Sequence, residues 1–156
     1  MFYPAKASTL AFLMERKKAV DRDKPKVQSQ ITFLYYRDLQ PVCKFYEEIM
    51  GFELIEDQGW AKIYRVNGNA YLGIVDEERG FHKAQEKSAV LITLVVDDVF
   101  WWYDYLKRKG VKILTELQEV EDIQIRGFFL EDPGRYAIEV QQFLRPDVAR
   151  IFHQGD

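Results

Sequence analysis

The sequence has little of several features that define common protein classes. Its 156 residues include one cysteine, Cys43, which excludes a disulfide framework within the chain and favours a reducing compartment. No segment approaches the roughly 20 consecutive apolar residues that a membrane helix needs. The net charge of -3 provides no basic surface for nucleic acid or anionic membrane. These absences predict a cytoplasmic protein with neither a nucleic-acid nor a membrane partner.

The composition is that of a folded chain, with 47% hydrophobic and 30% charged residues. Its length fits one domain or two fused modules. Residues 1–29 read as an extension, with a short helix over 9–19 and a polar linker that contains Pro25. No small-residue cleavage site follows, so we expect no secretory signal. Residues 145–156 form a tail, expected either as one helical turn or as a frayed end.

One pattern occurs twice in the chain. An apolar strand ends near Asp38, an amphipathic helix follows, and Gly51 precedes a second strand. The same order recurs with Asp98 and Gly110. Aspartate suits a helix N-cap, and glycine suits the left-handed residue that ends a helix. Each copy continues into a turn signal, over residues 67–69 and 132–135. A duplicated unit predicts a pseudo-symmetric fold with a ligand cleft between its equivalent strands.

Hydrophobic periodicity supports helices after both aspartates. Val42, Phe45, Tyr46 and Ile49 form one buried stripe, and Val99, Trp102 and Leu106 form the other. We predict an α+β fold of two βαβββ modules, residues 30–78 and 88–144 of a domain at 30–144, forming a mixed, curved sheet around a cleft with the helices outside. The expected strands are 31–37, 52–56, 60–66 and 70–75, then 90–96, 112–114, 123–130 and 136–142.

Three segments of the chain resemble the vicinal oxygen chelate superfamily. They are residues 37–54, residues 96–113, and the strand–turn–strand of 128–140 with its Asp-Pro-Gly turn and later Glu139. That superfamily includes glyoxalase I, bleomycin-resistance proteins, fosfomycin-resistance enzymes and extradiol dioxygenases. The resemblance implies the fold predicted above. It also implies a homodimer, because members commonly dimerise or pair modules across chains.

Metal-binding members of the superfamily hold their ion with one group per strand. The corresponding positions here are Ile31, Leu91, Gly73 and Glu139, of which only Glu139 has a donor side chain. Because transition-metal sites usually take three or four protein ligands, we expect no metal and no cofactor. The resemblance then points to the bleomycin-resistance branch, whose cleft binds a small molecule without transforming it.

Strand alternation assigns side chains to the two sheet faces. One face is uniformly apolar, as expected beneath helices, whereas the other mixes aromatic and polar side chains, as expected for a ligand cleft. Trp60 and Tyr64 are predicted to share an aromatic wall with Tyr35 and Tyr71, which would suit a flat or cationic ligand. The same residues also suit plain core packing. The predicted ligand-binding set is Phe33, Tyr35, Trp60, Tyr64, Tyr71, Thr93, Arg126, Glu139 and Gln141.

Glu139 has two interpretations, as a functional acceptor or base in an apolar cleft, or as an idle carboxylate paired with a cation. Arg126, on the neighbouring strand, is its expected partner in either case.

His82 is interpreted either as a general base that closes over the cleft or as an exposed loop histidine. The case for a functional role of His153 is weaker still. Trp101 and Tyr105 form an outward apolar patch, expected to be covered by the N-terminal helix or a second subunit.

Three functions follow from these observations. The leading hypothesis is a metal-free protein that binds a small aromatic or cationic organic molecule. The alternative is a metal-dependent lyase, isomerase or dioxygenase that uses Glu139 and His82 in an unrecognised arrangement. A third is a structural or regulatory protein with a vestigial cleft, whose aromatic patch binds a partner.

Overall fold

The computed structural model describes residues 11–15 and 27–153. Residues 11–15 are helical, within the helix predicted over 9–19. The rest of that prediction and most of the predicted linker lie outside the described residues. No helix in the described part is long and apolar enough to cross a membrane.

The first module contains the predicted strand, helix and three further strands. Its strands form one sheet in the order β1-β4-β3-β2, in which β1 and β4 are parallel and the other pairs are antiparallel. The elements are β1 (Gln30–Tyr36), α2 (Leu39–Lys44), η1 (Phe45–Ile49), β2 (Glu53–Asp57), β3 (Ala61–Asn67) and β4 (Ala70–Asp76).

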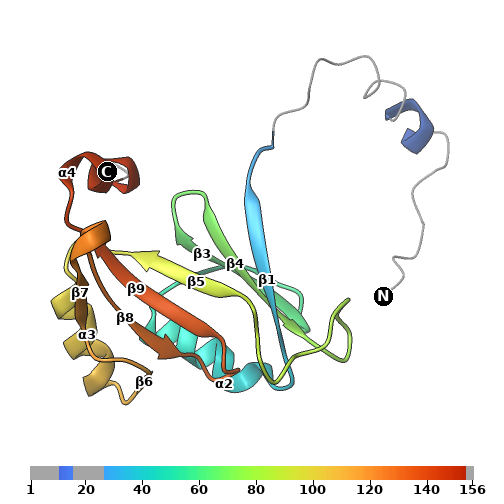
Figure 1. Cartoon of the computed structure of the whole chain (residues 1–156). Coiled ribbons are helices and arrows are strands. Elements are labelled where there is room, and N and C mark those ends of the chain that lie inside the picture. Colours follow the sequence, from blue (N-terminus) through green and yellow to red (C-terminus); the bar gives the residue numbers. More distant parts are fainter. Residues whose placement is uncertain (1–10, 16–26, 154–156) are drawn as a thin grey trace.

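The second module repeats this arrangement in a second sheet, in the order β5-β9-β8-β6, with β7 also paired to β8 (Figure 1). The short β7 and the 3-10 turn η2 were not predicted, because a three-residue strand carries almost no alternation. The elements are β5 (Leu91–Val95), α3 (Val99–Arg108), β6 (Lys112–Ile113), β7 (Gln118–Val120), η2 (Glu121–Ile123), β8 (Ile125–Glu131) and β9 (Ala137–Phe143). The α+β class with two βαβββ modules is therefore confirmed.

The two modules share one strand register as well as one element order. Each first strand pairs in parallel with the last strand of its module. The equivalent pairs are Ile31–Tyr71 and Leu91–Ala137, Phe33–Gly73 and Thr93–Glu139, and Tyr35–Val75 and Val95–Gln141. A residue in one module can therefore be matched to its counterpart in the other from the backbone alone.

Both helices begin and end where the sequence predicts. The side chains of Asp38 and Asp98 accept hydrogen bonds from the backbone N–H groups of Gln40 and Trp101. Gly51 and Gly110 each adopt a φ of 72°, a left-handed conformation that costs glycine little. The first helix differs in passing from α to π geometry at Phe45. This change accommodates its extra residue between aspartate and glycine, relative to α3.

The core lies on the helix-covered faces of both sheets. Leu34, Ile74, Ile138 and Val140 are buried there, as the alternation of apolar residues predicts. Helix α3 contributes Val99 and Leu106.

A buried polar cluster joins the modules at one end. Asp132, 4% exposed, accepts hydrogen bonds from the hydroxyls of Tyr36 and Tyr46 at 2.6 and 2.8 Å. Its other oxygen accepts from the backbone N–H groups of Gly134 and Tyr136. Burial raises the pKa of Asp132, and the four hydrogen bonds to its carboxylate oppose that rise. The Asp-Pro-Gly turn of the second module is thus bonded to the first strand and first helix.

The C-terminal tail folds further than expected. Instead of one turn or a frayed end, it forms α4 (Pro146–Phe152), which packs on β9. The rings of Phe143 and Phe152 stack with centroids 5.0 Å apart, and His153 Nε2 lies 3.3 Å from Asp97 Oδ1. The sequence signal for this helix is weak because its apolar face has a partner only after β9 is in place.

Candidate functional site

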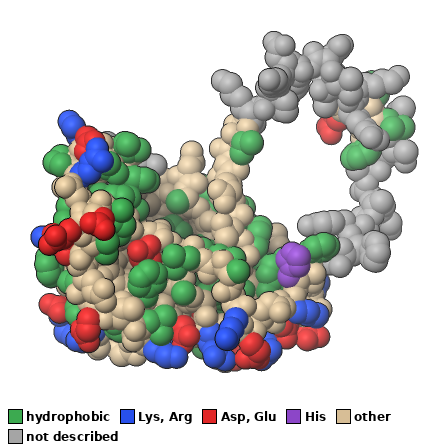
Figure 2. Space-filling model, viewed as in Figure 1, with side chains coloured by type: hydrophobic (Ala, Val, Ile, Leu, Met, Phe, Trp, Pro, Cys, Tyr) green, Lys and Arg blue, Asp and Glu red, His purple; other side chains and the backbone are tan. Residues whose placement is uncertain are grey.

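The faces of the two sheets that lack helices are open and carry solvent-exposed apolar side chains. Ile31, Phe33, Leu91 and Val95 are between 37 and 47% exposed, although all four lie within strands. Figure 2 shows a hollow between β1 and the part of the molecule that carries α4, lined mainly by hydrophobic and uncharged atoms. In the same view, charged side chains gather along the opposite, lower edge. We call the face that carries these four residues the open face.

Glu139 lies on the open face in β9, opposite Thr93 of β5. The Thr93 hydroxyl donates a hydrogen bond of 2.8 Å to Glu139 Oε2, and this contact fixes the carboxylate on its strand. Arg126 is not its partner. Arg126 points to the helix side, where it pairs with Glu119 at 2.7 Å and lies over the ring of Phe100 in α3. The prediction was wrong because neighbouring strands bring Phe129, not Arg126, opposite Glu139.

The position equivalent to Glu139 in the first module is covered by an aromatic ring. Gly73 pairs with Phe33, and a Cβ placed on Gly73 would lie 2.2 Å from Cδ1 of that ring. The ring therefore fills the volume that a side chain would take at this position. Glycine at 73 and phenylalanine at 33 form one packed unit, which makes this half of the open face flat and apolar.

The donor set on the open face does not fit a transition metal. Ile31, Leu91 and Gly73 offer no donor atom, and the ring of Phe33 covers the third position. Over residues 11–15 and 27–153, no group of three or more His, Cys, Asp or Glu side chains could hold an ion.

The predicted aromatic wall does not assemble. Tyr64 is fully buried on the helix-covered face, and its hydroxyl donates to Glu47 at 2.7 Å. Its pKa is raised by burial first and by the bond to Glu47. Trp60 precedes β3, and the guanidinium of Arg79 lies 5.3 Å from the centre of its ring. Strand β3 begins one residue later than predicted. Side-chain alternation along the paired strands β3 and β4 places Tyr64 and Tyr71 on opposite faces of the sheet.

Tyr71 and Tyr35 have partners that the sequence did not indicate. The guanidinium of Arg65 lies 5.6 Å from the Tyr71 ring centre and also pairs with Glu53. Arg65 and Tyr71 are cross-strand partners, so strand register was the signal that could have found this contact. The Tyr35 ring meets the edge of the His82 ring at 5.3 Å.

His82 is exposed to solvent, whereas Gln141 is buried. His82 is exposed in the loop after β4, in accordance with the second of its two interpretations. Gln141 is only 9% exposed, beside Gly127 on the neighbouring strand. Of the nine predicted side chains, the structure brings Thr93 and Glu139 into direct contact, keeps Phe33 and Tyr71 on the open face and removes Tyr64 and Arg126 from it.

Comparison with known proteins agrees with this architecture. The model of the Glyoxalase/Bleomycin resistance protein/Dioxygenase superfamily matches residues 28–140. Protein YraH of Bacillus subtilis (strain 168) is 26% identical over 121 residues, which cover 71% of this chain and 94% of YraH.

Two solved structures illustrate the shared fold. Lactoylglutathione lyase from Agrobacterium tumefaciens superposes with a TM-score of 0.61 at 18% identity, covering 76% of this chain and 96% of the lyase. The fosfomycin resistance protein FosX from Listeria monocytogenes superposes with a TM-score of 0.64 at 15% identity, covering 80% of this chain and 99% of FosX. At such low identity the likeness establishes the fold alone. The duplicated modules and the match over most of the chain place this protein in the Glyoxalase/Bleomycin resistance protein/Dioxygenase superfamily.

Proposed function

We propose that the protein binds a small aromatic or cationic organic molecule on the open face, without a metal and without transforming it. The observation that carries the proposal is the pairing of exposed apolar side chains with one fixed carboxylate. Phe33, 41% exposed, offers a flat ring, and Glu139 offers the negative charge. Stacking on an aromatic face and attraction to a carboxylate together favour a planar cation.

Three features support binding rather than metal-dependent chemistry. The family positions for metal ligands hold Ile31, Leu91 and Gly73, and the last is packed under Phe33. The Glu139 carboxylate is tied to Thr93 instead of to another acid or a histidine. His82 contacts Tyr35 and Phe81, and neither contact supplies the metal donors or base partner that the enzyme alternative requires.

The test uses proflavine, a planar aromatic cation, in a fluorescence titration of the full chain. We expect saturable binding, weakened roughly tenfold by Glu139→Gln, since the charge is lost while an oxygen can still accept from Thr93. Phe33→Ala is expected to weaken binding similarly by removing the stacking surface. Arg126→Ala serves as the control and is expected to bind as wild type does, because Arg126 faces the helices.

Two results would overturn the proposal. One is equal proflavine affinity in wild type and Glu139→Gln. The other is a metal content near one equivalent per chain in protein purified without chelator.

The proposal includes a homodimer. Trp101 is 51% exposed and stacks on Tyr105 with ring centroids 4.8 Å apart, so α3 presents a flat aromatic surface to solvent. Phe100, on the same helix, is 54% exposed. Burial of such rings against a second copy would remove apolar area from water.

A further inference from the structure

The equivalence of the modules makes the two places where they meet directly comparable. At the first junction the end of β1 meets the start of β9, where the backbone N–H of Tyr35 donates to the Tyr136 hydroxyl at 3.0 Å. At the second junction the end of β5 approaches the start of β4. Strand register makes Val96 the counterpart of Tyr36 and Ala70 the counterpart of Tyr136. Because a bulge in β3 pairs Asn67 with Ala70, Asn67 is the counterpart of Asp132, whose backbone N–H bonds to Tyr136.

The first junction is filled by large side chains. Tyr36 and Tyr46 are at most 2% exposed and bond to Asp132, and the Tyr136 ring packs edge-on against Tyr36 at 5.2 Å. A Cβ placed on Gly134 would lie 2.2 Å from Cδ1 of Tyr36, so even the turn is in tight contact. Two grooves border this junction, of about 200 and 430 Å³. Both are lined partly by charged side chains, including Arg135.

The second junction has smaller, uncharged side chains in the same places and is hollow. Val96 and Ala70 stand in place of two tyrosines, and the uncharged Asn67 stands in place of the aspartate. A cavity of about 450 Å³ lies here and reaches the edge of β5. That volume lies within the range of small-molecule sites. Its lining consists of Met50, Gly51, Phe52, Val66, Asn67, Ala70, Thr93, Leu94, Val95, Val96, Trp102, Ile151 and Phe152.

None of these described lining residues carries a formal charge. Asn67 and Thr93 supply the polar side chains, and the remainder is aliphatic, aromatic or glycine. A charged ligand would lose its hydration here without gaining a counter-charge, which is costly. The chemistry of the lining therefore selects a neutral, largely apolar molecule that makes one or two hydrogen bonds.

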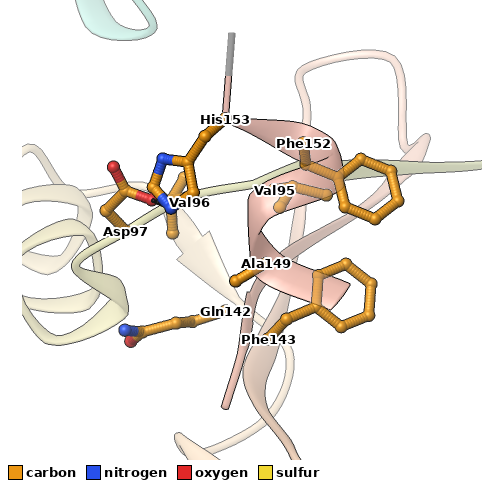
Figure 3. A pocket seen from close by; sticks show the side chains of 8 residues that line it. All are labelled: Val95, Val96, Asp97, Gln142, Phe143, Ala149, Phe152 and His153. Atoms are coloured by element: carbon orange, nitrogen blue, oxygen red, sulfur yellow. Dashed lines mark ion pairs between the residues drawn. The ribbon is translucent and has the colours of Figure 1, made fainter. Parts of the chain in front are cut away.

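Helix α4 forms one wall of this cavity. Ile151 and Phe152 line it, and the stack of Phe152 on Phe143 holds the helix against β9 (Figure 3). His153 turns toward Asp97 in a smaller cavity of about 340 Å³, which shares Val95, Val96 and Phe152 with the larger one. The cavity at the second junction thus depends on a segment beyond residue 140, where the family match ends.

We infer that the second junction is a binding site for a small neutral aromatic molecule, separate from the cationic ligand proposed for the open face. Thr93 and Val95 border both the cavity and the open face, but the two sites differ in charge. Glu139 is absent from the lining of the cavity.

Indole, a neutral aromatic molecule with one N–H donor, is the probe, measured by calorimetric titration of the full chain. Wild type is expected to bind it saturably. Ala70→Tyr places at the second junction the residue that fills the first. It is expected to weaken indole binding roughly tenfold and, by filling a cavity, to raise the melting temperature. The matched control is Ala137→Tyr. The equivalent position in the first module is Tyr71, so a strand of this fold accepts a tyrosine ring there.

Val66→Phe fills the same cavity from β3 and replaces Ala70→Tyr if that variant does not fold. Absence of saturable indole binding to wild type, or unchanged affinity in a folded cavity-filling variant, would overturn the inference. Glu139→Gln separates the two proposals, since it is expected to weaken proflavine and leave indole unaffected. Loss of indole binding in Glu139→Gln would place the probe on the open face and would also overturn the inference.

Discussion

Single side chains determine what each half of the open face presents to solvent. Phe33 lies over Gly73, and Thr93 holds Glu139, in two pairs that occupy equivalent positions of the two modules. One pair therefore presents a ring and the other presents a charge. This difference between otherwise repeated strands is the residue-level basis of the proposed binding function.

Buried tyrosines make stability sensitive to alkaline pH. Burial raises the pKa of Tyr36, Tyr46 and Tyr64 well above the ordinary value of 10.0. The folded state therefore keeps these protons while the unfolded chain loses them. Their contribution is fully present below pH 10 and is lost as pH rises above it, by about 1.4 kcal/mol per pH unit for each tyrosine.

The measurement is the free energy of unfolding in urea from pH 8 to pH 11. Tyr64→Phe is expected to be about 1 kcal/mol less stable at pH 8, since the bond to Glu47 is lost, and to show a shallower decline above pH 10. Identical alkaline slopes in the variant and wild type would show that Tyr64 ionises normally in the folded protein.

At the scale of elements, a left-handed glycine ends each of the two helices. Gly51 and Gly110 share a φ of 72°, and a Cβ on either would meet no atom within 4 Å. The cost of a substitution there is therefore one of backbone conformation alone. Gly51→Ala and Gly110→Ala are each expected to lower the free energy of unfolding by about 1 kcal/mol.

The two variants control for each other in chemical denaturation. Equal losses are expected despite the π geometry that precedes Gly51 and is absent before Gly110. A loss at Gly51 several times that at Gly110 would mean that the π segment depends on this residue.

At the scale of the whole molecule, the aromatic surface of α3 gives the proposed dimer a measurable consequence. Trp101→Glu places a charge beside Tyr105 and is expected to convert a dimer to a monomer, measured by light scattering after gel filtration. Lys107→Glu, on the same helix, alters charge without touching that stack and is expected to keep the wild-type mass. An unchanged mass for Trp101→Glu would contradict the assignment of this surface to a second copy.

Local patterns in the chain determined most of the architecture. Asp38, Asp98, Gly51 and Gly110 mark helix ends through interactions that span only a few residues, so their roles can be read without a structure. Period-two alternation likewise placed Leu34, Ile74 and Ile138 under the helices. The duplication itself is a property of the sequence, and it predicted two βαβββ modules.

Only the tertiary structure decided which side chains meet. Arg126 and Glu139 lie on adjacent strands but on opposite faces, and Tyr64 bonds to a helix residue. Asp132 accepts hydrogen bonds from both modules. The cavity at the second junction depends on Ala70, Val96 and Phe152, which come together only after both sheets and α4 have packed. Sequence spacing specifies the direction of a side chain along its own element, whereas contact between elements depends on register and packing that no short pattern encodes.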